Sequence, residues 1–373
     1  MDQFEQIEKK YIYPSSINQK FDLWMDFIRR VPEDEKIFFT QNLGVMLKSG
    51  LSASRAFRTL AMQTSNTKFK RILIKITRNV EKGITISESM KKFPSTFSPI
   101  FISMINAGET SGQLESVLSQ LTSQLKRSHE IKNKIKSSLM YPLAILIAMI
   151  IIGIGMIVFV IPKMTAIFGD LNAELPLPTR ILIGISNWTN KYIFIVAPAV
   201  LIIICLIFWL TRKGPCQKIW HKIILSLPII KKISIKINLA QLSRTLSSLL
   251  ATDIPIVKSI TLTSQVIKNV IYKNSLTQMT SQLEQGKTIS SQMKKFPKLY
   301  TPIAQQMMQV GEETGEISNI LEQLANFYEE DVSNTMDSLP SIIEPVLILT
   351  LGCAVGAMAV AIIMPMYSLS NAI

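Results

Sequence analysis

One block of sequence occurs twice in this chain, and the duplication constrains the fold more than any single motif does. Residues 81–118 and 284–321 are related by a constant offset of 203 with no gap, and 17 of their 38 positions are identical. Unrelated helical segments would not keep one register over that length, so the chain is an internal duplication. The repeat extends over about residues 39–170 and 242–373, and each copy ends in an apolar stretch.

Three stretches are long and apolar enough to cross a membrane. Residues 139–161 and 192–210 contain no charged side chain, and none follows Glu344 up to the last residue. About 20 apolar residues match the hydrocarbon core of a bilayer, whereas a buried core helix is usually shorter. We therefore predict transmembrane helices at residues 139–161, 192–210 and 342–365.

Positive charge predicts how these helices are oriented. Residues 1–138 contain 22 Lys and Arg, residues 211–341 contain 15, and residues 162–191 contain 3. Cationic flanks stay in the cytoplasm, and the first 138 residues contain no apolar run that could act as a signal peptide. The sequence therefore predicts a cytoplasmic N-terminus and an extracytoplasmic C-terminus.

Outside the apolar stretches the pattern is helical, with few residues that favour strands. Phe39, Leu43 and Leu47 follow at helical spacing and Gly50 then stops the helix, and a later helix stops near Gly83. Ser87 is a candidate N-cap, and Pro99 opens another helix. The predicted fold is all-α: a polytopic membrane protein with two homologous cytosolic six-helix bundles and three transmembrane helices. The predicted domains are an N-terminal extension (1–35), the first bundle (36–138), span 1 (139–161), an extracytoplasmic loop (162–191), span 2 (192–210), a basic linker (211–238), the second bundle (239–341), span 3 (342–365) and a short tail (366–373).

Each repeat contains a Gly-Glu-x-x-Gly motif, which we interpret as a turn before the sixth helix. Two interpretations stay open. In the structural one, the glycines supply backbone freedom, Ser111 or Thr314 caps the following helix, and the glutamate lies near the positive end of that helix. In the functional one, the two acidic turns face outward and bind a partner by charge complementarity. The motif residues are Gly108, Glu109 and Gly112 in the first repeat and Gly311, Glu312 and Gly315 in the second.

The third span begins with an ionisable residue, Glu344, which is either hydrated at the headgroup level or retained for a function. Proline pairs at equivalent positions of the first and third spans are candidate bend points, because proline removes a helical hydrogen bond. These prolines are Pro142, Pro162, Pro345 and Pro365.

No pattern predicts catalysis, a cofactor or a metal. The chain lacks a Gly-Lys-Ser/Thr phosphate loop, and its two histidines, His129 and His221, lie far apart in basic flanks. The cysteines show neither paired nor metal-ligand spacing. We attribute the net charge of +14 to cytosolic flanks that touch anionic lipid, rather than to a nucleic-acid partner.

The two Gly-Glu-x-x-Gly motifs, each preceded by Lys-Phe-Pro and Pro-Ile, resemble those of the type II secretion F / type IV pilus PilC family. Tyr141-Pro142, the segment LPLPTRIL at residues 175–182 and Glu344-Pro345 support the resemblance, which covers residue 39 to the C-terminus. Asp253 stands where the family usually has glycine, although Asp tolerates left-handed backbone.

The resemblance implies an inner-membrane platform protein of a pilus or secretion machine, without enzymatic activity. It implies as partners a cytosolic hexameric assembly ATPase, pilin or pseudopilin subunits, other inner-membrane assembly components and further copies of the chain. In this interpretation the bundles pass motion from the ATPase to the spans, which guide subunits out of the bilayer. The alternatives are a small oligomeric transporter or channel, which would normally carry polar residues within its spans, and a membrane-tethered interaction scaffold.

Overall fold

The computed structural model of the chain describes residue 4, residues 31–163, a few positions between 179 and 198, and residues 228–370. Most of the predicted second span (192–210), of the N-terminal extension, of the predicted extracytoplasmic loop and of the basic linker lies outside the described residues. Within the described part every regular element is a helix, which confirms the all-α prediction for that part.

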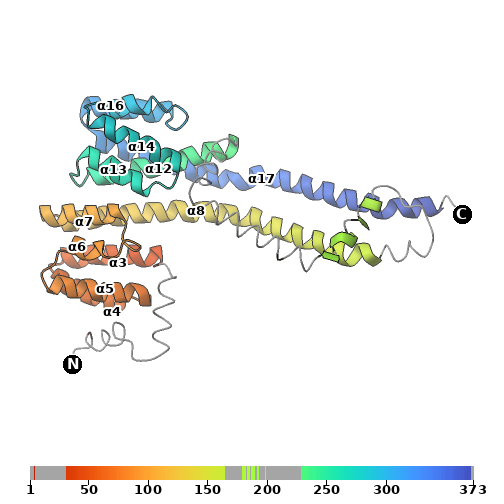
Figure 1. Ribbon diagram of the computed structural model, residues 1–373, viewed down its shortest axis with the longest axis horizontal. Coiled ribbons are helices and arrows are strands. Elements are labelled where there is room, and N and C mark those ends of the chain that lie inside the picture. Colours follow the sequence, from red (N-terminus) through yellow and green to blue (C-terminus); the bar gives the residue numbers. More distant parts are fainter. Residues whose placement is uncertain are drawn as a thin grey trace. The chain divides into compact units, whose positions relative to one another are not determined.

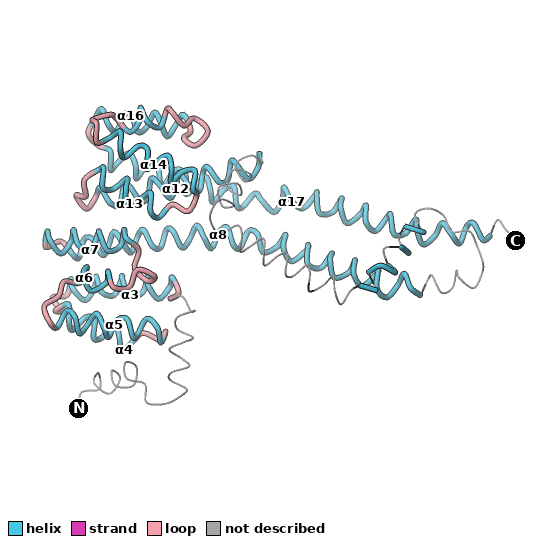
Figure 2. The backbone as a smooth tube through the Cα atoms, in the orientation of Figure 1, coloured by secondary structure: helices cyan, strands magenta, loops and turns pink. Residues whose placement is uncertain are grey.

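The first repeat contains a run of short helices followed by one long helix (Figures 1 and 2). Gly50 and Gly83 have φ of 81° each, so both stop a helix in left-handed backbone, as the sequence predicted. Pro99 is the first residue of its helix, also as predicted. The helices are α3 (Glu33–Lys48), α4 (Ala53–Gln63), α5 (Thr67–Glu81), α6 (Ile86–Lys91), α7 (Pro99–Ser111) and α8 (Leu114–Gly155).

The second repeat repeats this order closely. After a shift of 203 residues, α4 and α7 coincide with α13 and α16 at both ends. Asp253 has a φ of 57° at the position equivalent to Gly50, which confirms that an aspartate takes the left-handed turn there. The helices are α12 (Pro228–Leu250), α13 (Ile256–Val266), α14 (Val270–Leu283), α15 (Ile289–Met293), α16 (Pro302–Thr314) and α17 (Ile317–Ser370).

The chain divides into two compact units. The first comprises residues 1–132 and 221–332, and the second comprises residues 133–220 and 333–373. Both sets of short helices therefore belong to one unit, and each set has its own apolar core. Within this first unit α7 packs on α13, and Leu249, Ile254 and Leu262 of the second repeat join the core of the first. The domain boundaries drawn from the sequence at 138/139 and 341/342 stay a prediction.

The second unit contains the apolar parts of α8 and α17. The helical segments Leu114–Lys163 and Ile317–Val360 are long and apolar enough to cross a membrane, and only 6% of the most apolar window of each is buried. Lys134 and Asp337, which occupy equivalent positions of the two repeats, form an ion pair of 2.6 Å between Nζ and Oδ1. Unburied apolar surface of this extent indicates helices that face lipid or other helices.

A local change of helix type precedes the second proline of the first span. Residues Met156–Val160 form a single π-helical turn, η1, between α8 and Pro162. Proline has no N–H to donate and its ring crowds the carbonyl four residues earlier, so a widened turn at this place has a physical cause. Pro142 and Pro345, by contrast, lie inside α8 and α17 without interrupting them. The predicted bends at the four prolines stay a prediction.

Candidate functional site

The Gly-Glu-x-x-Gly motifs are not turns, which corrects the prediction from sequence. Helix α7 continues to Ser111 and α16 continues to Thr314, so the first four residues of each motif are helical. Only the last glycine leaves the helix: Gly112 has a φ of 71° and Gly315 a φ of 76°. Left-handed backbone strains any residue with a Cβ atom, and this explains the second glycine of the motif.

The glutamate of each motif binds the start of another helix. The Glu109 carboxylate accepts hydrogen bonds from the backbone N–H groups of Ile86 and Ser87, the latter at 2.8 Å between N and Oε2. Glu312 does the same in the second repeat with Ile289 and Ser290, the latter at 3.0 Å. Both carboxylates are partly buried. The motif therefore clamps α7 to α6 and α16 to α15.

This arrangement satisfies the open end of a very short helix. The first N–H groups of a helix have no partner within it, and α6 has only six residues. Thr85, rather than the predicted Ser87, is the N-cap, and its hydroxyl accepts from the N–H of Glu88. Glu109 accepts from the two preceding N–H groups, so three consecutive donors are bound. A carboxylate is also attracted to the positive end of the helix dipole.

The first glycine of each motif allows two helices to approach closely. A Cβ atom on Gly108 would lie 2.9 Å from Val117 Cγ2 and 3.1 Å from Leu114 Cα. On Gly311 it would lie 3.2 Å from Ile320 Cβ. Real Cβ contacts are essentially never as short as 2.9 Å and are rarely as short as 3.2 Å, so packing against the following helix, and not a turn, favours glycine at both positions.

The structural interpretation made from the sequence was wrong about the partner helix. Ser111 does not cap α8, because its hydroxyl donates back to the carbonyl of Ala107 at 2.9 Å. The Thr314 hydroxyl also donates to the carbonyl of Val310, but it accepts a hydrogen bond of 3.4 Å from the N–H of Glu316, the residue just before α17. The glutamates lie at the start of the helix before their own and not of the helix after it. The sequence contained a signal for this, since Thr-Ile-Ser occurs 22 to 24 residues before the glutamate in both repeats. Binding of a partner by these glutamates stays a prediction.

The other predicted residues lie along the long helices and are not brought to the two clamps. Glu344 is exposed within α17, and among the described residues it has no hydrogen bond or ion pair. Pro142 is buried in α8, Pro345 is exposed in α17, and Pro365 lies near the end of α17. Over the part of the chain that the structure describes, no three His, Cys, Asp or Glu side chains come together in a way that could hold a metal ion.

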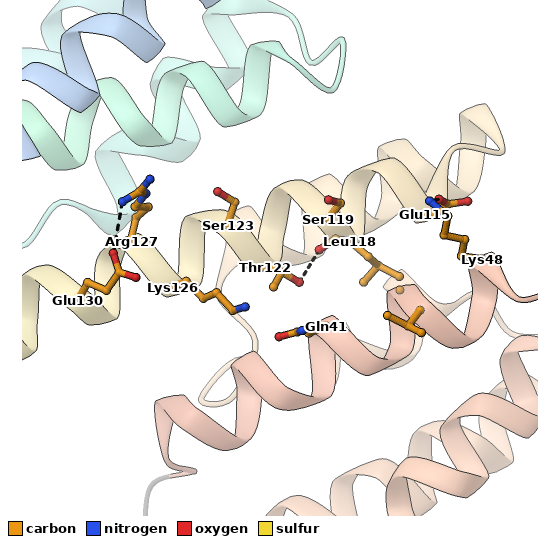
Figure 3. A pocket seen from close by; sticks show the side chains of 12 residues that line it. Gln41, Lys48, Glu115, Leu118, Ser119, Thr122, Ser123, Lys126, Arg127 and Glu130 are labelled. Atoms are coloured by element: carbon orange, nitrogen blue, oxygen red, sulfur yellow. Dashed lines mark hydrogen bonds and ion pairs between the residues drawn. The ribbon is translucent and has the colours of Figure 1, made fainter.

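The structure also shows a groove that the sequence did not predict, between α3 and α8 (Figure 3). Its volume is about 570 Å³, and Gly44 and Leu118 are among the residues that line it; a Cβ on the glycine would meet Leu118 Cβ at 3.3 Å. Lys48 and Glu115 form an ion pair of 3.0 Å at one end, and Arg127 and Glu130 form a longer one of 3.5 Å at the other.

At the equivalent place in the second repeat, an ion pair joins α12 to α17. Arg244, equivalent to Gln41 of the groove, binds both carboxylate oxygens of Glu329 at 2.8 and 2.7 Å. The two side chains are 12% and 11% exposed. Glu329 is equivalent to Lys126. A comparison of the repeats at offset 203 would have revealed that Gln41 and Lys126 of the first repeat are replaced by Arg244 and Glu329 in the second.

Comparisons with known proteins match the chain over both repeats. The sequence profile of the family described as "Type II secretion system (T2SS), protein F" matches residues 39–162 and again residues 242–365. The type IV pilus assembly protein PilC of Thermus thermophilus is 30% identical over 334 residues, which are 89% of this chain and 81% of that protein. PilC of Myxococcus xanthus is 28% identical over 90% of this chain and 81% of its own length. Type II secretion system protein F of Aeromonas hydrophila is 25% identical over 98% of this chain and 96% of its own length.

Proposed function

This chain belongs to the type II secretion system protein F family, and from that premise we propose that it is a non-enzymatic platform in the inner membrane of a bacterial pilus or secretion machine. The named relatives are pilus assembly proteins and secretion system proteins, so the proposed role is assembly rather than catalysis. The proposed topology has two six-helix bundles in the cytoplasm, three spans, a cytoplasmic N-terminus and an extracytoplasmic C-terminus.

The continuity of the long helices is the observation that supports this role best. Helix α8 runs 42 residues and α17 runs 54 residues, from packed helical bundles into apolar segments, without a loop between. A continuous helix resists bending over this length far better than a linker does. We infer that motion received by the bundles from a cytosolic hexameric ATPase reaches the spans through these helices, and that the spans guide pilin or pseudopilin subunits out of the bilayer.

The test interrupts α8 between the helical bundle and the apolar segment. Inserting two Gly residues after Lys136 in α8 interrupts the connection while leaving the core residues of the first unit unchanged. We expect membrane level and ATPase association to persist and filament or secretion output to fall by at least about tenfold, because two glycines weaken a helix by about 2 kcal/mol. The matched control inserts two glycines at the exposed turn after Gly83, outside the connection. Full output from the α8 insertion would exclude transmission through this helix.

A transporter or channel is the alternative function. It would make liposomes containing the purified chain permeable to small solutes, which a platform would not do. Binding of the ATPase by Glu109 and Glu312 is a separate proposal, tested by replacing both with Gln. Lost ATPase association with unchanged hydrogen-exchange protection of α6 and α15 would support binding. Loss of protection with ATPase association retained would assign the glutamates to the fold.

A further inference from the structure

Within the first compact unit, the two repeats contact each other through different surfaces. Helix α7 of the first repeat packs on α13 of the second. Because α13 is equivalent to α4, and α16 to α7, a two-fold contact would also pair α4 with α16. Instead these helices lie on opposite outer sides of the unit, with α7 and α13 between them (Figure 1). The contact is therefore heterologous, because it joins two different surfaces. Each chain also carries a second copy of each surface, on α16 and on α4, and the internal contact leaves these two copies unused.

The unused copy of the α7 surface is exposed on α16. On α7, Ser103, Ala107 and Thr110 line the cleft beside the start of α13, and Ile100 lies on the same face one turn earlier. The equivalent residues of α16 are Gln306, Val310, Glu313 and Ile303, and all four are exposed. Ile100 is 3% exposed whereas Ile303, the same residue type at the equivalent position, is 49% exposed. Helix α16 thus exposes two apolar side chains, Ile303 and Val310, where α7 has buried Ile100 and partly buried Ala107.

The unused copy of the α13 surface lies on α4 and the turn before it. In the second repeat Ile254 and Leu262 are 5% and 8% exposed and belong to the core of the first repeat. Their equivalents Leu51 and Thr59 are only partly buried, and Arg55, equivalent to Lys258, is exposed. Over the residues that the structure describes, the first repeat therefore presents the equivalent surface without a helix that covers it as α7 covers α13.

The two unused surfaces carry opposite charges. The internal cleft of about 340 Å³ is lined by neutral Thr110 and Gln113 from the first repeat, and by Asp253 and Lys258, one charge of each sign, from the second. At the positions equivalent to Thr110 and Gln113, the second repeat has Glu313 in α16 and Glu316 just after it. At the position equivalent to Lys258, α4 has Arg55. Over the described residues none of these three side chains forms an ion pair. Opposite unpaired charges on complementary surfaces favour and orient an association.

We propose that a second copy of this chain places its α4 surface on the α16 surface of the first, repeating the internal α7–α13 contact between molecules. The α4 surface comprises Leu51, Arg55 and Thr59, and the α16 surface comprises Ile303, Val310 and Glu313. Because the contact is head-to-tail, it continues from copy to copy and closes into a ring or extends as a row. The proposal concerns the surface between copies, so its failure would leave the proposed platform function intact.

Cysteine cross-linking in native membranes tests the geometry. Full-length chains with two different tags are produced together in a background where Cys205, Cys216 and Cys353 are replaced by Ser. One chain carries Arg55→Cys and the other Glu313→Cys. A short bis-maleimide should join the two tags at a level at least about tenfold above a matched control that pairs Glu313→Cys with Lys75→Cys, an exposed residue of α5.

A charge exchange tests the chemistry. With a second cysteine pair, Thr59→Cys and Val310→Cys, either Arg55→Glu or Glu313→Arg alone should lower the mixed cross-link by about three- to tenfold, since close exposed charge pairs contribute modestly. The two reversals together should restore it. A mixed cross-link no higher than the control, or one dominated by Arg55→Cys with itself, would overturn the proposal. Membrane levels of each variant, measured by immunoblot, identify any chain that fails to fold, and the second cysteine pair then decides.

Discussion

Replacing Glu109 by Ala removes the acceptor for two backbone N–H groups at the start of α6. A hydrogen bond to a charged group contributes about 1.5–3 kcal/mol, and the helix dipole adds about 0.3–1 kcal/mol. Because the carboxylate is only partly buried, water can replace it in part as the acceptor for these N–H groups. We therefore expect α6 to lose about 2–4 kcal/mol of local stability. The neighbouring Thr85 cap stays in place and keeps the third N–H bound.

Hydrogen exchange on the full-length chain in detergent measures this loss locally. A loss of 2–4 kcal/mol corresponds to about a 30- to 700-fold fall in protection of the α6 amides, as each 1.4 kcal/mol is a factor of ten. Glu312→Ala should lower the protection of α15 by a similar factor, and the two losses should add because the clamps belong to separate repeats.

The matched control is Glu88→Ala, which removes an exposed carboxylate from the first turn of the same helix. We expect a change within about 0.5 kcal/mol, the usual range for an exposed side chain. If Glu109→Ala left α6 protected and yet abolished assembly, the structural interpretation of the clamp would be refuted and a partner-binding role would take its place.

Four further predictions follow from packing, backbone strain, charge and burial. Gly108→Ala should destabilise the first repeat by about 1–3 kcal/mol through overpacking, and Gly112→Ala by about 1–2 kcal/mol through left-handed strain, both read from urea midpoints. Arg244→Ala should cost up to about 3–5 kcal/mol because it leaves the largely buried carboxylate of Glu329 without its partner. An unchanged midpoint would contradict this. Burial raises the pKa of Tyr272 above its ordinary value of about 10. The stability that the neutral phenol contributes is therefore complete below about pH 10, and it falls as the pH rises further, by up to about 1.4 kcal/mol per pH unit. Tyr272→Phe should flatten that fall in alkaline unfolding curves.

The alkaline effect should be confined to the second repeat. Phe69 and Phe97 occupy the positions equivalent to Tyr272 and Tyr300, so the first core contains no phenol there. Burial also raises the pKa of Tyr300, whose hydroxyl pairs with Ser275 at 2.8 Å. Equal loss of protection in both repeats above pH 10 would show that other groups control alkaline unfolding.

The sequence by itself determined the features that depend on neighbouring residues and on the repeat. The spacing of apolar residues and the glycines at positions 50 and 83 predicted where helices run and stop, because periodicity and left-handed turns are local properties. The duplication predicted that the second half copies the first, and Asp253 adopted the turn expected of the glycine it replaces.

Only the tertiary structure decided which groups meet across the chain. Glu109 was expected beside the helix that follows it, yet it binds residues 22 and 23 positions earlier, because the chain folds back and brings α6 against α7. Helix packing also decides that the first repeat has a groove where the second has the Arg244–Glu329 ion pair. It likewise decides that α7 contacts α13 without an equivalent contact between α16 and α4. Side-chain partners depend on how helices pack, and two repeats with the same helices can pack their surfaces differently once each has its own charges.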